Sequence, residues 1–272
     1  MKPILISLSL MLCSIASAAQ SQSPDEILRE GTLLYRSEMA SWNGSDIFFE
    51  KCKNLQDQVG GYFSYGAQAL TYCIFFTKDQ DPKVLCSIAF DSTYDVNTAQ
   101  VALEQRNFTQ EESKIYAIRQ QALTAVQKDP IFKTYKNTSL NIVPVVSNDV
   151  RKVYVLTGPK TTGVVVFGND YLLTFDEQNR LTGTKKLHKN IIPINYGKET
   201  DNAITMHTHL PATGDYITPT DICTLMLYGK YAKWKQHYVI SKNYVSIWDC
   251  EKNLLATPTK KAWDQMNEQK SK

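Results

Sequence analysis

The chain has 272 residues, of which 43% are hydrophobic and 21% are charged, and its formal net charge is +3. This length and apolar content allow one large or two small folded domains. So small a net charge does not indicate a protein that binds nucleic acid or anionic lipid. We therefore look for function in local motifs rather than in overall charge.

The first residues have the features of a secretory signal peptide. Lys2 precedes an apolar run at residues 4–15, and small residues around Ala18 offer a cleavage site. The run is too short to be an ordinary membrane span. Cys13 follows a leucine rather than a small residue, which argues against a lipoprotein anchor. We expect residues 1–19 to be removed and the protein to be exported to the periplasm or the cell exterior, with no integral membrane segment in the mature chain.

The next segment predicts a helix followed by an antiparallel meander. Ser23-Pro24-Asp25-Glu26 combines an N-cap, a proline at N1 and an acid at N3, which is typical of a helix start. Trp42-Asn43-Gly44-Ser45 indicates the end of that helix. Three runs rich in β-branched and aromatic residues follow, at residues 61–65, 72–77 and 83–90.

A second helix and a connection complete the first half. Thr109-Gln110-Glu111-Glu112 is a capping box, and apolar residues at helical spacing continue to Asp129-Pro130, where the helix must stop. Residues 137–144 have the character of a connection between two folding units. We therefore expect a small α+β domain of unknown role at residues 20–145 and a second domain at residues 146–272.

The second half is richer in strands. The expected strands are residues 152–157, 163–167, 171–175, 181–187, 203–209, 237–241 and 244–248, with one helix at residues 218–231. Helices and strands are mixed without a regular βαβ alternation, so the sequence predicts an α+β fold.

Two histidines and one acid form the strongest chemical motif. His207 and His209 alternate with other residues on the expected strand, so both point to one face. Asp221 lies in the first turn of the following helix and can turn back toward them. Two imidazoles and one carboxylate would leave the fourth tetrahedral position of Zn²⁺ for water. A helix cap built by Thr218, Pro219 and Asp221 explains the same residues without a metal.

The pattern His-x-His, a loop, then Thr-x-x-Asp resembles the zinc site of JAMM/MPN metallopeptidases, in particular their bacterial secreted or toxin-associated branch. The likeness covers about residues 150–251. It implies a mixed sheet with flanking helices, zinc ligation by His207, His209 and Asp221, and a Thr218 that helps to stabilise the oxyanion. It also implies hydrolysis of a peptide or amide bond by a zinc-bound water.

One part of that motif is missing. The family's general base is a glutamate on an earlier strand, but residues 153–166 contain no acid. The nearest acids are Asp170, Asp176 and Glu177, and the last two lie in an expected hairpin turn. His188, at the end of a strand, could act as an extra ligand or a proton shuttle. The base is therefore unassigned.

The cysteines leave two interpretations open. Export would permit disulfides, and Cys73 and Cys86 could face each other in the meander. All five could instead be small buried side chains. The five cysteines after the signal peptide are Cys52, Cys73, Cys86, Cys223 and Cys250.

Three functions follow from these observations. The first is an exported zinc-dependent hydrolase acting on peptide or protein substrates. The second is a non-catalytic binding or immunity-type protein on the same fold, lacking the base. The third is a disulfide-supported secreted binding protein in which the histidine pair is incidental.

Overall fold

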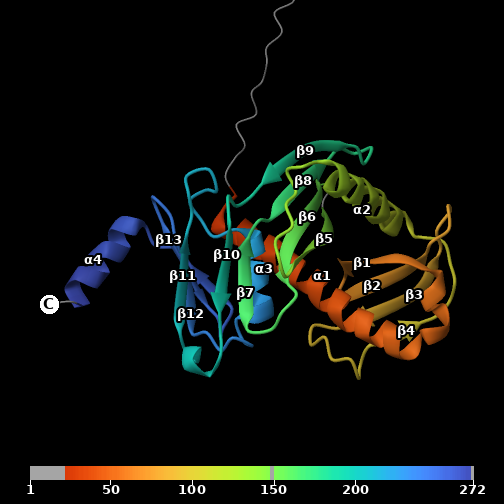
Figure 1. Ribbon diagram of the computed structural model, residues 1–272, viewed down its shortest axis with the longest axis horizontal. Coiled ribbons are helices and arrows are strands. Elements are labelled where there is room, and N and C mark those ends of the chain that lie inside the picture. Colours follow the sequence, from red (N-terminus) through yellow and green to blue (C-terminus); the bar gives the residue numbers. More distant parts are fainter. Residues whose placement is uncertain (1–21, 148–149, 271–272) are drawn as a thin grey trace, which may run out of the picture.

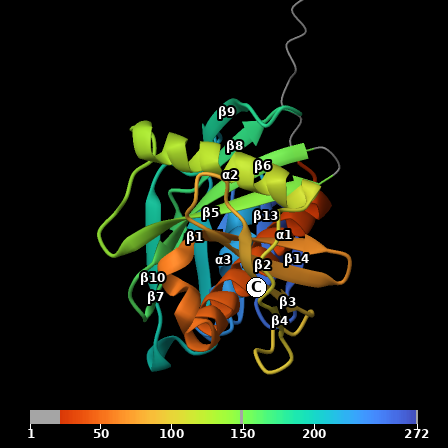
Figure 2. The same ribbon diagram turned by 90° about the vertical axis from the view of Figure 1, so that its right-hand side faces the viewer.

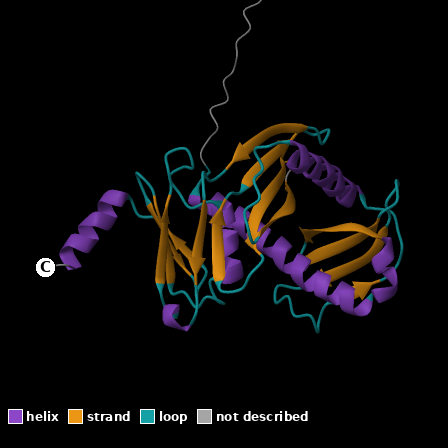
Figure 3. Ribbon diagram, viewed as in Figure 1, coloured by secondary structure: helices purple, strands orange, loops and turns teal. Residues whose placement is uncertain are grey.

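The computed structural model describes residues 22–147 and 150–270, so the expected signal peptide and Cys13 lie outside the described residues. The expected α+β class is confirmed, since helices combine with largely antiparallel sheets. Three groups of strands follow one another along the molecule, and helix α1 (Pro24–Lys51) extends from the C-terminal group to the N-terminal one (Figure 1). Figure 3 shows the same division into helices and strands.

Helix α1 begins at the expected capping box between Ser23 and Glu26. It does not end at residues 42–45, as the sequence indicated, but continues to Lys51. The reason is packing against strand β2 (Leu70–Thr77). A Cβ atom on Gly44 would lie only 2.8 Å from Cβ of Cys73, so this glycine allows the helix to approach the sheet closely.

The N-terminal sheet contains the expected three-stranded meander and a short fourth strand that the sequence did not predict. Its strands β1 (Val59–Ala67), β2, β3 (Val84–Phe90) and β4 (Gln100–Ala102) pair antiparallel in chain order, after the short 3-10 helix η1 (Lys53–Gln58). Its core is aromatic: the rings of Phe48 and Phe75 stack with centroids 4.1 Å apart. This stacking fixes α1 on the sheet.

Helix α2 (Gln110–Lys128) begins at the expected capping box of Thr109 and Glu112 and ends before Pro130. It covers the central sheet, whose strands β5 (Thr138–Ser147), β6 (Val150–Pro159), β8 (Tyr171–Phe175) and β9 (Leu181–Lys186) lie in the order β5-β6-β8-β9. Ile118 and Ala122 of α2 are buried against Val153 and Tyr171 of this sheet. Figure 2 shows α2 lying across it.

Strand β5 corrects the expectation of a connection at residues 137–144. Its residues pair one by one with β6, from Thr138 opposite Pro159 to Ser147 opposite Val150. Pro144 is compatible with a strand here because β5 is at the edge of the sheet, where a missing N–H costs no ladder bond. The boundary expected near residue 145 falls inside this strand.

The C-terminal group contains a two-stranded and a four-stranded sheet. Strand β7 (Val164–Gly168) pairs with β10 (Ile191–Asn195), and β11 (Ile204–Thr208) pairs parallel with β12 (Gln236–Ile240). The strands β13 (Val245–Asp249) and β14 (Leu254–Ala256) continue antiparallel, which makes this sheet mixed. The sequence did not predict β10, β14, helix η2 (Lys198–Thr200) or helix α4 (Lys260–Lys270).

Helix α3 (Pro219–Tyr228) joins the C-terminal group to α1. A Cβ atom on Gly31 of α1 would lie 2.7 Å from Cβ of Ile222, so the two helices are in close contact. Helix α3 therefore occupies a fixed position between β11 and the rest of the protein.

All five cysteines of the described residues are buried free thiols. Cys73 lies opposite Ile88 and Cys86 lies opposite Phe75, so Cys73 and Cys86 are not cross-strand partners as the sequence suggested. Cys86 instead interacts with Cys52 at the end of α1.

Within the described residues, none of the helices is both long enough and apolar enough to cross a lipid bilayer.

Candidate metal centre

All four histidines of the sequence meet in one buried region. His188, His207, His209 and Asp221 each offer one ligand atom, and these atoms lie within 4.8 Å of one another. The structure thus brings together the three residues that the sequence proposed as ligands and adds His188. This cluster could bind a metal ion.

The alternation of strand β11 produces the histidine pair. As whole residues, His207 and His209 are 5% and 6% exposed. Met206, which precedes His207 on β11, is 55% exposed. His207 lies within the strand and His209 directly follows it, so both rings point inward. The sequence-based prediction that the two rings share one face is confirmed.

The start of helix α3 positions the acid. Thr218 is the N-cap, and its backbone N–H and hydroxyl donate to Oδ2 of Asp221 over 2.9 and 2.7 Å. The predicted helix cap is therefore present. The cap holds Oδ2, which also lies 3.3 Å from Nε2 of His209, and leaves Oδ1 facing His188 and His207.

The distances within the cluster suit a tetrahedral ion. Nε2 of His207 lies 3.1 Å from Nε2 of His209. The carboxylate oxygens of Asp221 lie 3.5 Å from Nε2 of His188, 3.7 Å from that of His207 and 3.3 Å from that of His209. Ligands bound to zinc at 2.0–2.1 Å in a tetrahedron are about 3.3 Å apart. The printed separations among His207, His209 and Asp221 are thus close to those of a tetrahedral site, and His188 lies within 4.8 Å of the other ligand atoms.

Several polar atoms of the cluster lack hydrogen-bond partners within the described residues. They are Oδ1 of Asp221 and both ring nitrogens of His188. Buried polar groups without partners are rare and costly. A metal bound by Oδ1 and by Nε2 of His188 would satisfy two of them, so the donor set fits an ion.

Outer contacts orient two of the imidazoles. Nδ1 of His209 donates to the carbonyl oxygen of Tyr216 over 2.9 Å. Nδ1 of His207 lies 2.9 Å from Nε2 of His237, whose own Nδ1 lies 2.7 Å from the hydroxyl of Thr205. Partners of this kind on the far ring nitrogen are typical of metal-ligating histidines.

Asp170 stands behind the third imidazole. Its Oδ2 lies 3.6 Å from Nδ1 of His188, and its Oδ1 accepts from the backbone N–H of Thr157 over 2.8 Å. The other two acids considered as bases lie elsewhere: Asp176 accepts from backbone N–H groups of its own turn, beside Glu177. Among the described residues, the hydrogen bonds and ion pairs of the cluster involve no glutamate.

Electrostatics favour the protonation states that a metal needs. Burial lowers the pKa of His207 to about 4 and that of His237 to about 3, so both rings are neutral near pH 7. Burial opposes ionisation of Asp221, but His188 and His207 hold its pKa well below the ordinary range. Burial also opposes protonation of His188, yet Asp221 and Asp170 raise its pKa overall. Without a metal ion, a proton on His188 would thus balance the negative charge of Asp221.

The sequence indicated His188 only as a possible extra ligand and Asp170 only as a nearby acid, and it did not point to His237 as a supporting group. The only signal shared by His188 and His237 is composition, since the chain has just four histidines. Neither the loop after β9 nor strand β12 carries a motif that points to β11.

Fold and site together define an α+β protein with a buried candidate metal centre. No protein-family model, curated protein or solved structure matches the chain. The resemblance to JAMM/MPN metallopeptidases therefore rests on the motif alone.

Proposed function

We propose that this protein binds one zinc ion through His188, His207, His209 and Asp221. The observation that carries the proposal is the convergence of four buried ligand atoms within 4.8 Å of one another. Three imidazoles and one carboxylate form a ligand set that suits zinc. Two orphaned atoms inside the cluster support a bound cation.

The geometry favours a structural ion over a catalytic one. The four side chains are no more than 5% exposed. Structural zinc sites have four protein ligands, whereas catalytic sites keep one position open. The ion would tie strand β11 and helix α3 to the segment after β9. We infer that the protein is a non-catalytic module that binds a peptide or protein partner. The N-terminal residues suggest that it is exported.

Zinc-dependent hydrolysis is the second candidate, and the pair formed by Asp170 and His188 favours it. In this arrangement His207, His209 and Asp221 would hold the ion alone. Asp170 would orient the ring of His188. Nε2 of His188 would then act as the general base, the role of the missing glutamate. Bound zinc would supply Lewis-acid chemistry toward an amide carbonyl. Thr218 would have to release Asp221 before its hydroxyl could assist an oxyanion.

Metal analysis of purified variants separates the two. We expect about one zinc per chain in the native protein by mass spectrometry, lost in the His207→Ala/His209→Ala double variant and kept in the Asp176→Asn control. If His188→Ala also loses zinc, the closed site is supported. If it keeps zinc and loses an amide-hydrolase activity of the native protein, the hydrolase is supported. A native protein that retains no added zinc would overturn both.

A further inference from the structure

A polar cavity lies between the N-terminal and central sheets, away from the metal cluster. It measures about 210 Å³. Helix α1, strand β1, helix α2 and strand β5 line it, and these four elements surround one region in Figure 1. A space of this size holds several waters or a small molecule.

The cavity wall carries two ionisable side chains, one acidic and one basic. Glu38 of α1 is 6% exposed, and its hydrogen bond in the structure comes from Nδ2 of Asn141 over 3.2 Å. Arg119 of α2 has a buried Nε without a hydrogen-bond partner. Its guanidinium lies 6.0 Å from the centre of the Phe76 ring, which holds it without neutralising it.

Neither side chain has an ionic partner among the described residues. The two side chains line the same cavity, yet they do not form an ion pair with each other at 4.0 Å or less. Buried charges in proteins are normally paired. Glu38 and Arg119 thus line one cavity without neutralising each other, so a ligand that carries both charges would supply a partner for each.

Three serines of the cavity wall are joined by hydrogen bonds, while the wall also contains apolar side chains such as Trp42 and Leu140. The hydroxyl of Ser37 donates to the carbonyl of Ser64 over 3.2 Å, and the hydroxyls of Ser41 and Ser64 are 2.8 Å apart. These bonds fix α1 to β1 beside Glu38. The cavity is thus preformed, which lowers the entropic cost of binding.

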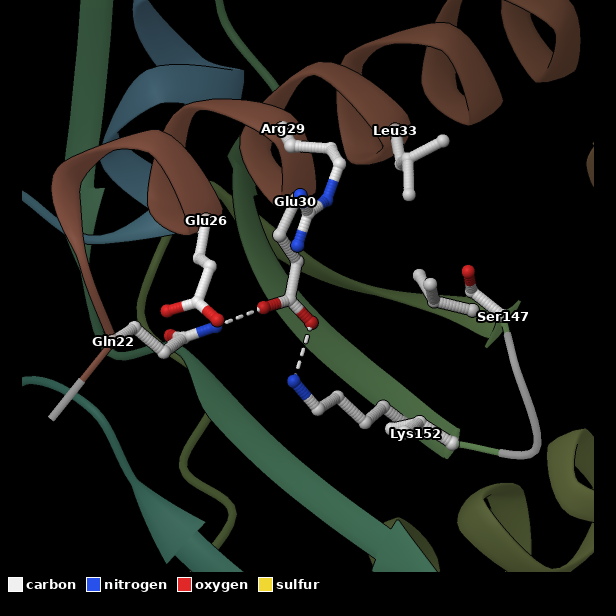
Figure 4. Close-up of a pocket in the computed structure, with 9 residues that line it drawn as sticks. Gln22, Glu26, Arg29, Glu30, Leu33, Ser147 and Lys152 are labelled. Atoms are coloured by element: carbon white, nitrogen blue, oxygen red, sulfur yellow. Dashed lines mark hydrogen bonds and ion pairs between the residues drawn. The ribbon is translucent and has the colours of Figure 1, made fainter. Parts of the chain in front are cut away.

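A neighbouring pocket shows the contrasting case. There Glu30, on the same helix, accepts from Nζ of Lys152 over 2.7 Å and also from the side-chain amide of Gln22 (Figure 4). Its charge is satisfied within the protein. This pocket gives no reason to expect a charged ligand, and Glu30 supplies a matched control.

We propose that the cavity between α1, β1, α2 and β5 binds a small zwitterion of the α-amino acid class. Its carboxylate would pair with Arg119, whose planar guanidinium suits a carboxylate. Its ammonium would pair with Glu38, and Asn141 would add a hydrogen bond. The site is independent of the metal centre.

The test is calorimetric titration of the full mature protein with each of the twenty common L-α-amino acids. We expect at least one to bind. Glu38→Gln and Arg119→Gln should each weaken its binding by about ten-fold or more, the usual effect of losing a charge-assisted bond. Glu30→Gln should bind as the native protein does.

Two further probes check the assignment of charges. The amine that lacks the carboxylate, and the N-acetylated acid that lacks the ammonium, should both bind more weakly than the parent amino acid. Thermal unfolding establishes that each variant is folded before titration. The proposal is overturned if no amino acid binds the native protein, if binding survives both substitutions, or if the amine binds as tightly as the zwitterion.

Discussion

The carbonyl oxygen of Tyr216 lies 2.9 Å from Nδ1 of His209 and fixes the tautomer of that ring. A carbonyl can only accept, so Nδ1 carries a proton, and in the neutral tautomer the lone pair is on Nε2. Nε2 of His207 lies 3.1 Å from Nε2 of His209. The two nitrogens can share a proton or point together at a cation. A tautomer fixed in this way makes the cluster a preformed acceptor.

Removal of zinc should destabilise the protein. With free zinc at a thousand-fold excess over its dissociation constant, binding contributes about 4 kcal/mol to the free energy of unfolding. We expect a chelator to lower the denaturant midpoint by a corresponding amount and the His207→Ala/His209→Ala variant to show no such response. Denaturant titrations with and without chelator measure this. Superimposable curves for the native protein would contradict a structural ion.

Asp170→Asn should weaken metal binding although Asp170 is not a ligand. The carboxylate orients His188 from behind and raises its basicity, and loss of such a partner typically costs 10- to 100-fold in metal affinity. Competition with a chromophoric chelator gives the affinity. Glu177→Gln, in the exposed turn after β8, is the control and should bind as the native protein does. Equal affinity for the Asp170 variant would remove this residue from the site.

Gly44→Ala should lower stability despite the helical preference of alanine. The added methyl would lie 2.8 Å from Cβ of Cys73, and overpacking of this kind costs about 1–3 kcal/mol. Gly197→Ala is the matched control, because nothing lies within 4 Å of its Cβ position and its φ of 177° is extended backbone. It should change the free energy of unfolding by less than about 0.5 kcal/mol. Equal effects of the two substitutions would refute the close contact between α1 and β2.

Glu38 should make the ligand-free protein less stable as the pH rises. Burial raises its pKa from the ordinary value of 4.5 to about 7, so the folded state holds the proton more tightly than the unfolded state. Its contribution is complete below 4.5 and is lost as pH rises through 7, a change of about 3 kcal/mol. Its titratable neighbours Tyr62, Cys223 and Tyr228 have raised pKa values and stay neutral in this range.

The difference in free energy of unfolding between the native protein and Glu38→Gln isolates this term. It should decrease between about pH 5 and pH 8 by roughly that amount. The difference also cancels proton effects at the metal cluster, which both proteins share. A difference that stays constant over this range would mean that Glu38 is already ionised in the folded protein at pH 5.

The sequence predicted elements whose signals are local. Capping boxes at Ser23, Thr109 and Thr218 located the start of α1, α2 and α3, and alternation located the histidine pair on β11. It failed where distant packing decides. Gly44 resembles a helix end in the sequence, but it is the position where α1 packs against β2. Strand β5 resembles a connection in the sequence, but its residues pair with β6.

The same distinction explains the site. His207, His209 and Asp221 lie close in sequence and share one local pattern, so they could be proposed together. His188 reaches them only because the segment after β9 returns to helix α3, and His237 only because β12 pairs parallel with β11. No periodicity encodes such long-range returns.

The ligands of the cluster come from three separate segments: the loop after β9, strand β11 with the residue that follows it, and the first turn of α3. An ion that holds them together restricts the unfolded chain as a covalent crosslink would. The five cysteines of the described residues form no such crosslink. If the proposed zinc ion is bound, the stability of the protein would follow zinc availability rather than redox state.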